Sequence, residues 1–81
     1  DTFMFNKRLR ELRMKRNFTQ QQLADNLNIA LRSYQCYEGG TRHPSFDLLV
    51  QIADILDVSL DYLFCRDEFM KAHGVFFDEF Q

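Results

Sequence analysis

The 81-residue chain has no tryptophan, a single proline, three glycines and two cysteines. No linker or low-complexity segment divides it, so we expect one domain. No apolar run approaches the roughly 18 residues that a membrane-spanning helix needs, and no signal-peptide pattern opens the chain. The two cysteines form no CxxC motif, so we expect reduced thiols in a cytoplasmic protein.

The residues needed for catalysis or metal binding are also scarce. Cys36, Glu38 and His43 lie close in sequence, but the convex face of a helix offers no pocket for a nucleophile there. Two histidines and two dispersed cysteines fit no zinc-ligand spacing. The sequence therefore predicts neither an enzyme nor a metal or cofactor site. For Cys36, a redox switch stays an alternative to a plain small surface residue.

The net charge is only −2, but the charges are unevenly divided along the chain. Residues 1–45 hold eight basic and four acidic residues, a balance of +4, whereas residues 46–81 hold two basic and eight acidic residues, a balance of −6. A basic half attracts phosphate and an acidic half is repelled by it, so this asymmetry can orient a protein on DNA. Taken alone, the division also fits ordinary solvated helix faces.

Residues 20–37, QQQLADNLNIALRSYQCY, have the pattern of two short helices joined by a tight corner. Ala24 is small enough to let the second helix pass close to the first, and Asn28 tolerates the positive φ that the corner needs. Such a corner presents the outer face of the second helix to the DNA major groove. The apolar interior between the two helices is expected to consist of Leu23, Leu27, Ile29, Tyr34 and Tyr37.

The flanking residues support the same boundaries. Thr19 and Gln22 form a T-x-x-Q capping box, and Phe18 precedes it at the position of a hydrophobic staple. Two glycines follow Glu38, and glycine is the usual residue just past a helix C-terminus. Pro44 then prevents any continuation of the helix. The signals together predict one helix-turn-helix unit.

The run from Leu9 to Leu63 resembles the Cro/CI-type (XRE-family) helix-turn-helix domains of phage repressors and bacterial regulators. Its most specific pieces are FTQQQLA, SYQCYEGGTRHPS and DVSLDYL. The resemblance implies a compact, all-α, five-helix bundle like that of lambda repressor, which binds double-stranded DNA and commonly forms a two-fold dimer. The chain departs from the family pattern at four positions: Asn28, Ala30, Leu31 and Cys36.

Helical periodicity and caps predict five helices. The expected ranges are residues 5–16, 20–27 and 31–38, then a helix capped by Ser45 that buries Leu49, Ile52, Ala53 and Leu56, and a short helix from Ser59 to about Phe64. We expect a helix-turn-helix domain over residues 1–66. Residues 67–81 form an apolar tail that can fold as a sixth helix, and Gly74 breaks this tail into two pieces.

The 100° helical step predicts which side chains face the groove. Arg32 is the best candidate base reader, because a guanidinium can donate two hydrogen bonds to guanine. Leu31 can touch a thymine methyl, and Gln35 can read adenine or bind phosphate. The predicted base-reading set is Leu31, Arg32, Gln35 and Cys36.

Phosphate contacts are expected at the start of the first motif helix and in the loop after the second. Free helix N-terminal amides favour an anion near Gln20, and the resemblance also implies a phosphate-binding glutamine there. The resemblance further implies backbone contacts from Thr41, Arg42 and His43, although a solvent-facing loop histidine is an equal alternative. It also implies a structural ion pair between Arg13 and Glu38, which would leave Arg13 unavailable for base reading.

The tail is rich in large apolar groups, namely Phe69, Met70, Val75, Phe76, Phe77 and Phe80. It can fold back on its own core, with Phe3 and Phe5, or form a self-association surface. Two functions follow. The leading one is a transcriptional regulator, a repressor, acting as a homodimer on a palindromic operator. The alternative is an antitoxin-like or other interaction module that binds a protein partner through the tail.

Overall fold

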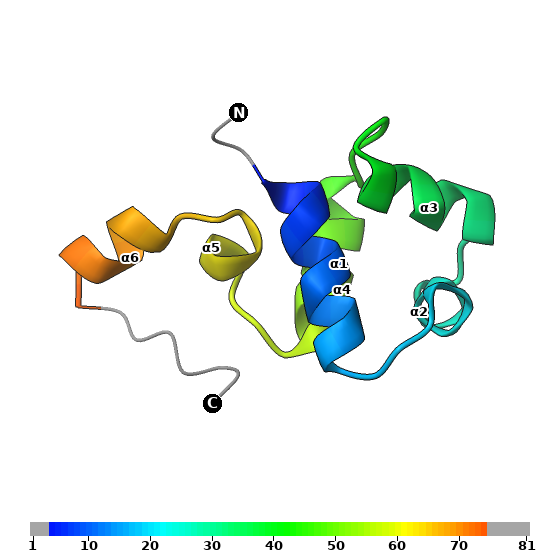
Figure 1. The fold of residues 1–81 in the computed structure, drawn as a ribbon, viewed down its shortest axis with the longest axis horizontal. Coiled ribbons are helices and arrows are strands. Elements are labelled where there is room, and N and C mark those ends of the chain that lie inside the picture. Colours follow the sequence, from blue (N-terminus) through cyan, green and yellow to red (C-terminus); the bar gives the residue numbers. More distant parts are fainter. Residues whose placement is uncertain (1–3, 75–81) are drawn as a thin grey trace.

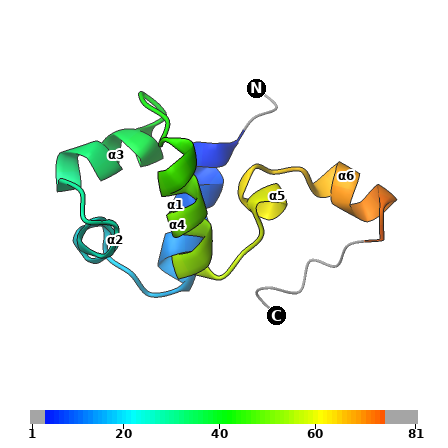
Figure 2. The same cartoon turned by 180° about the vertical axis from the view of Figure 1, so that it is seen from behind.

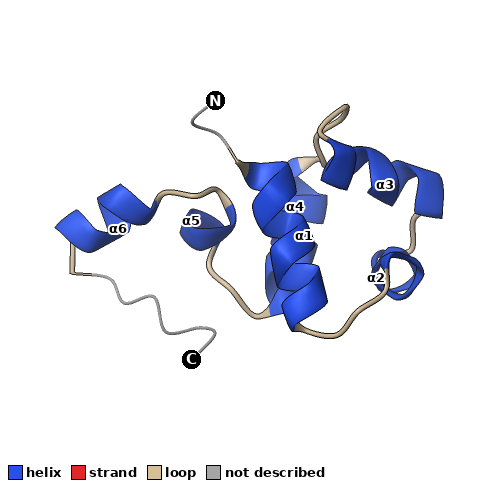
Figure 3. Ribbon diagram, in the orientation of Figure 1, coloured by secondary structure: helices blue, strands red, loops and turns tan. Residues whose placement is uncertain are grey.

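A computed structural model describes residues 4–74, which are all-helical as predicted (Figures 1 and 3). Within that range there are no strands, and no helix is both long and apolar enough to cross a membrane. The helices, in chain order, are α1 (Phe5–Lys15), α2 (Gln20–Leu27), α3 (Leu31–Gly39), α4 (Phe46–Leu56), α5 (Leu60–Leu63) and α6 (Asp67–Ala72).

The predicted caps set the helix boundaries. Thr19 and Gln22 form the capping box of α2, while Ser45 and Ser59 accept hydrogen bonds from the first-turn amides of α4 and α5. Asn28 ends α2 in the left-handed region, at φ 60°. These local interactions confirm the start and the corner of the predicted helix-turn-helix.

Three predicted ends were wrong by one residue, and one of them is that of α5, which stops at Leu63 rather than Phe64. The first helix stops at Lys15 rather than Arg16, whose amide still bonds to the carbonyl of Leu12 at 3.0 Å. Helix α3 extends through Gly39, because the left-handed turn falls at Gly40, with φ 83°. A Cβ at Gly40 would lie 3.3 Å from the Asn6 side-chain amide, so this position favours glycine for both its backbone and its close neighbour.

The helices are arranged in three groups along the longest axis (Figures 1 and 2). Helices α1 and α4 occupy the centre, the pair α2–α3 lies at one end, and α5–α6 lies at the other. The four side chains predicted to be buried in α4 are buried, and α1 buries Phe5, Leu9 and Leu12. The core is built from Phe5, Leu9, Leu12, Leu23, Ala24, Leu27, Tyr34, Tyr37, Leu49, Ile52, Ala53, Leu56 and Leu63.

The sixth helix is attached to the bundle by both polar and apolar contacts. The guanidinium of Arg8 on α1 donates to both carboxylate oxygens of Asp67, at 2.7 and 3.0 Å, and to the carbonyl of Tyr62 at 2.9 Å. The same guanidinium lies 4.2 Å from the centre of the Tyr62 ring. The hydrogen bond from Arg8 also lowers the pKa of Asp67. Met70 is completely buried, so this part of the predicted tail belongs to the folded domain.

The remaining tail predictions concern residues outside the described range. Phe3, Val75, Phe76, Phe77 and Phe80 all lie there, so folding back and self-association both stay predictions. The protein-partner alternative depends on the same residues. The predicted division at residue 66 also stays a prediction, although Asp67 binds Arg8 on α1 and Met70 is buried.

Removing the Met70 side chain should show whether α6 unfolds together with the bundle. Because Met70 is buried, Met70→Ala should lower the free energy of unfolding by about 2–5 kcal/mol in urea titrations. Phe69→Ala is the matched control, since Phe69 is exposed and should cost less than about 1 kcal/mol. Equal effects of the two changes would mean that α6 is not part of the cooperative fold.

Candidate nucleic-acid interface

Helix α3 has one buried face and one face open to solvent. Tyr34 and Tyr37 are buried between α3 and the rest of the core. Arg32 and Gln35 are exposed, as the helical step predicted. Leu31 and Cys36 are half-buried, so each shows only part of its side chain on the outer face. Arg32 and Gln35 therefore dominate the surface that α3 presents.

The carboxylate of Glu38 lies behind this surface and joins three helices. Its Oε2 is 2.5 Å from Nε of Arg13, and its Oε1 accepts from Arg13 Nη2 at 3.3 Å. The Tyr34 hydroxyl donates to Oε2, and Nε2 of Gln20 donates to Oε1 at 3.1 Å. The Glu38 side chain is only 5% exposed and that of Arg13 only 12%. Arg13 is thus held inside the domain, in the ion pair that the family resemblance implied.

The surroundings of Glu38 keep it ionised. Burial opposes the charge, but the hydrogen bonds from Arg13, Tyr34 and Gln20 outweigh it and place the pKa of Glu38 below its ordinary value. The pKa of Tyr34 is raised by burial first and by its bond to the carboxylate second. Tyr34 therefore stays a hydrogen-bond donor to a charged acceptor.

Gln20 connects this buried carboxylate to the outer face of α3. An ionised carboxylate can only accept, so Gln20 must turn its amino group toward Glu38. Its carbonyl then faces Gln35, whose Nε2 donates to it at 3.2 Å. These two hydrogen bonds fix the orientation of the Gln35 amide. Its Nε2 donates to Gln20, and its Oε1 stays available to accept a hydrogen bond. Gln20 and Gln35 are 15 residues apart, so the sequence carries no local signal that predicts their contact.

The loop after α3 runs beside the same end of the domain. The Thr41 amide donates to the carbonyl of Cys36 at 3.1 Å, which closes the turn after the helix. The guanidinium of Arg42 lies 6.0 Å from the centre of the Tyr37 ring, at the outer limit of a cation–π contact. His43 packs its ring edge-on against Phe5, with 6.3 Å between ring centres. Thr41, Arg42 and His43 are all exposed, and Arg42 and His43 each lie near an aromatic ring.

Several of the basic residues in the first half of the chain serve internal contacts. Arg8 binds Asp67, Arg13 binds Glu38, and Arg16 donates to the carbonyls of Leu56 at 2.8 Å and Asp57 at 3.4 Å. These guanidiniums hold α1 to α3, to the end of α4 and to α6. The charge balance of the sequence therefore overstates the positive charge that this half offers to a ligand.

Acid should weaken the Glu38 cluster. Because the pKa of Glu38 is lowered on folding, its contribution to stability is complete above its ordinary value of 4.5 and is lost as the pH falls through the lower folded value. We expect Glu38→Gln to lower the free energy of unfolding at pH 7 by up to about 3 kcal/mol, since it leaves Arg13 without its countercharge.

Urea titrations between pH 7 and pH 3 measure this dependence. The difference between the original chain and Glu38→Gln should shrink on acidification. Asp54→Asn is the control, because Asp54 is an exposed carboxylate on α4 and should show a small, constant difference. A Glu38→Gln difference that stays constant down to pH 3 would contradict the assigned role of the carboxylate.

Comparisons with known proteins show which family the chain belongs to. The helix-turn-helix family model matches residues 9–63. The chain is 47% identical over 60 residues to the uncharacterized HTH-type transcriptional regulator YqaE of Bacillus subtilis (strain 168), covering 74% of this chain and 52% of that protein. It is 46% identical over 56 residues to the cryptic phage CTXphi transcriptional repressor RstR of Vibrio cholerae serotype O1, covering 69% of this chain and 50% of that protein.

A solved structure gives the same result for the fold. The crystal structure of a transcriptional regulator from Listeria innocua matches with a TM-score of 0.73 at 25% identity, over 79% of this chain and 60% of that chain. The chain spans about half the length of the curated relatives it matches. Family model, relatives and fold agree, and the chain belongs to the Cro/CI-type helix-turn-helix family of non-enzymatic, DNA-binding transcriptional regulators.

Proposed function

We propose that this chain binds double-stranded DNA sequence-specifically, with α3 in the major groove, and that it represses transcription as a homodimer on a palindromic operator. The observation that carries the proposal is the pair of exposed side chains on α3, Arg32 and Gln35, backed by the rigid Glu38 cluster. A helix held on its inner face by Tyr34, Tyr37 and Glu38 can enter a groove without rearrangement.

Arg32 is the proposed guanine reader. It lies in the first turn of α3, where recognition helices contact base edges, and its guanidinium can donate to both O6 and N7. Leu31 precedes it and shows part of its side chain, enough to contact a thymine methyl. Cys36 can add only a small, half-buried surface at the same face.

Gln35 is the proposed adenine reader, and its orientation supports this choice. One N–H of its amide is used by Gln20, which leaves one N–H donor and the Oε1 acceptor. Adenine offers the complementary pair in the major groove, the N7 acceptor and the N6 donor. Gln20 likewise keeps one N–H for a phosphate, and Thr41, Arg42 and His43 lie on the loop that would follow the backbone.

Binding should depend strongly on salt. Each neutralised phosphate contributes roughly −0.9 to the slope of log K against log salt concentration, so a dimer with several contacts per subunit should give about −4 or steeper. Fluorescence anisotropy with DNA fragments selected by the purified chain measures this slope. Failure to retain any genomic fragment at low salt would overturn the proposed function.

Single substitutions should separate base readers from phosphate contacts. Arg32→Ala should weaken the free energy of binding to the selected site by roughly 1–3 kcal/mol. It should also reduce the preference for one base pair in each half-site. Arg42→Ala should instead weaken all sequences about equally. If Arg32→Ala lowered specific and non-specific affinity by the same factor, Arg32 would be a phosphate contact.

The role of Gln20 can be measured at the base pair that Gln35 faces. Gln20→Leu removes the bond that orients Gln35, so it should reduce the preference for adenine there, although Gln20 itself is not proposed to touch a base. Gln21→Leu is the matched control, since Gln21 bonds only to Asp25 on α2 among the described contacts. An unchanged preference in Gln20→Leu would show that the adenine choice does not depend on this contact.

The homodimer follows from the size of the reading surface. One short helix contacts only a few base pairs, so specificity calls for two copies, with recognition helices about 34 Å apart on one DNA face. The apolar tail is a proposed contributor, together with α5. The contribution of the tail to the homodimer is tested by deleting residues 75–81 only. A deletion of residues 68–81 would also remove the buried Met70 side chain from the core.

A further inference from the structure

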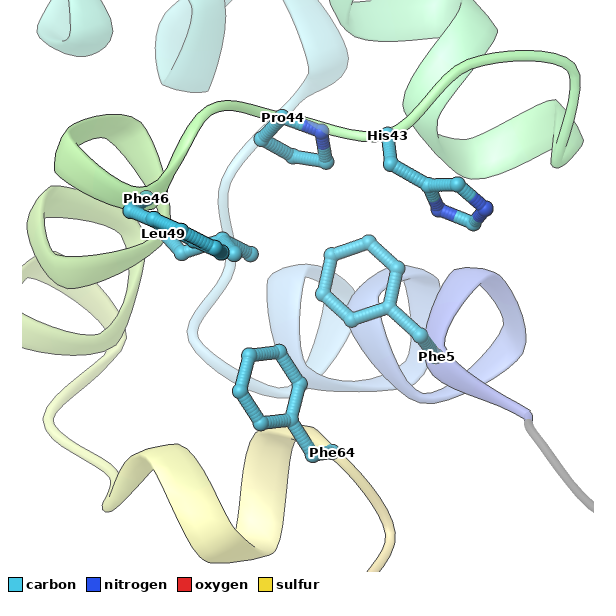
Figure 4. Close-up of a pocket in the computed structure, with 6 residues that line it drawn as sticks. All are labelled: Phe5, His43, Pro44, Phe46, Leu49 and Phe64. Atoms are coloured by element: carbon cyan, nitrogen blue, oxygen red, sulfur yellow. The ribbon is translucent and has the colours of Figure 1, made fainter.

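The loop that follows α3 rests against the first turn of α1. Figure 4 shows the ring of His43 on this loop turned toward the ring of Phe5, which is the first residue of α1. The two rings meet edge-on, with 6.3 Å between their centres. Both line an apolar pocket of about 260 Å³ that Pro44, Phe46, Leu49 and Phe64 complete. The loop therefore has a neighbour on α1 as well as on its own helix.

Asn6, the next residue of α1, contacts the place where the chain leaves α3. Its Nδ2 donates to the carbonyl oxygen of Glu38 at 3.5 Å. A Cβ at Gly40 would lie 3.3 Å from this Nδ2 and 3.4 Å from the Asn6 Cγ. Gly40 is the left-handed residue that ends α3. The half-buried Asn6 side chain is thus packed against the backbone at the start of the loop.

The turn on the α3 side is shared among several donors. The amides of Gly40, Thr41 and Arg42 all donate to the carbonyl of Cys36, the last two at 3.1 and 3.4 Å. The Thr41 hydroxyl approaches the same oxygen at 3.5 Å. A carbonyl oxygen has only two lone pairs, so these donors compete and none holds the loop firmly by itself. The contact from α1 adds a constraint that this turn does not supply.

We propose that Asn6 is a positioning residue for DNA binding. It holds the loop after α3 in the conformation in which Thr41, Arg42 and His43 meet the phosphates. Asn6 itself is not proposed to touch DNA. The inference rests on the proposed function, in which this loop is assigned to the DNA backbone.

The physical reason is that a loop ordered before binding does not have to be ordered by it. Association otherwise loses the freedom of each loop and side chain that the complex immobilises. Phosphate contacts carry no sequence information, so weakening them lowers the affinity for every sequence. Loss of the Asn6 side chain should therefore reduce affinity without changing the choice of bases, which Arg32 and Gln35 are proposed to make.

Hydrogen exchange tests the position of the loop without DNA. Asn6→Ala should speed the exchange of the Thr41 and Arg42 amides by about tenfold, because the turn then opens more often. The amide of Ile29 donates to Ala24 at the other corner of the motif and should be unchanged. Circular dichroism should show the variant folded, since alanine favours a helix more than asparagine does. Unchanged exchange at Thr41 and Arg42 would overturn the inference.

A double-mutant cycle tests the packing of Asn6 on Gly40. Gly40→Ala should raise the equilibrium constant of unfolding, because its Cβ would meet the Asn6 amide and its φ is positive. The Asn6→Ala background removes the first cause, so the same change should raise the constant by a smaller factor there. An equal factor in both backgrounds would show that Asn6 does not pack on Gly40 and would contradict the inference.

DNA binding by Asn6→Ala should fall by a similar factor for all sequences. We expect the Kd to rise by roughly fivefold to tenfold, both for the selected site and for unrelated DNA, in fluorescence anisotropy titrations. Asn26→Ala is the matched control, since the Asn26 amide donates only to the carbonyl of Gln22 on α2 among the described contacts. It should change either Kd by less than about twofold. Weakening of the selected site alone by Asn6→Ala would mean that Asn6 acts on base reading, and the inference would be wrong.

Combination with Arg42→Ala shows whether Asn6 acts through the loop. If Asn6 positions Arg42, then Arg42→Ala should weaken binding much less in the Asn6→Ala background than in the original chain. Arg32→Ala provides the comparison, because Arg32 lies on α3 and its effect should be the same in both backgrounds. Additive effects of Asn6→Ala and Arg42→Ala would overturn the inference.

The inference and the proposed function fail in different ways. Absence of DNA binding by the original chain would refute the proposed function, and with it the role of Asn6, whatever the exchange rates show. DNA binding by the original chain that Asn6→Ala leaves unchanged would refute the role of Asn6 alone.

Discussion

The carboxylate of Glu38 holds three helices in their relative positions. It accepts from α1 through Arg13, from α2 through Gln20 and from its own helix through Tyr34. A buried charge is costly unless each of its lone pairs is satisfied, so the carboxylate is stable only when all three helices are correctly placed. The angle at which α3 leaves the core thus depends on one polar cluster and on the aromatic pair Tyr34 and Tyr37.

Three arginines at α1 show why a count of basic residues overestimates the positive charge that the domain offers to a ligand. Arg8, Arg13 and Arg16 each turn inward, toward a carboxylate or toward carbonyls at the ends of other helices. Guanidinium is suited to this role because its donors form a fixed planar fork that can satisfy two acceptors at once. Helix α1 therefore acts as the support to which α3 and α6 are both attached.

Sequence reasoning succeeded where the deciding interactions are local. Thr19, Asn28 and Ser45 act on backbone groups within a few residues, and the burial of Tyr34 and Tyr37 follows from helical period alone. The Arg13–Glu38 contact came from the family resemblance. Contacts between residues that are distant in sequence have no such signal. Arg8 and Asp67 are 59 residues apart, and His43 meets Phe5 only when the loop after α3 folds over α1.

The bond between Gln20 and Gln35 also affects how relatives of this chain can be compared. The hydrogen-bonding pattern that Gln35 offers is determined partly by a residue on α2, and that residue is in turn oriented by a carboxylate in the interior. If α3 reads DNA as proposed, two family members with identical α3 sequences can differ in their preferred operators when they differ at the position of Gln20. A recognition code for the proposed reading must then include α2 and the buried acid together with α3.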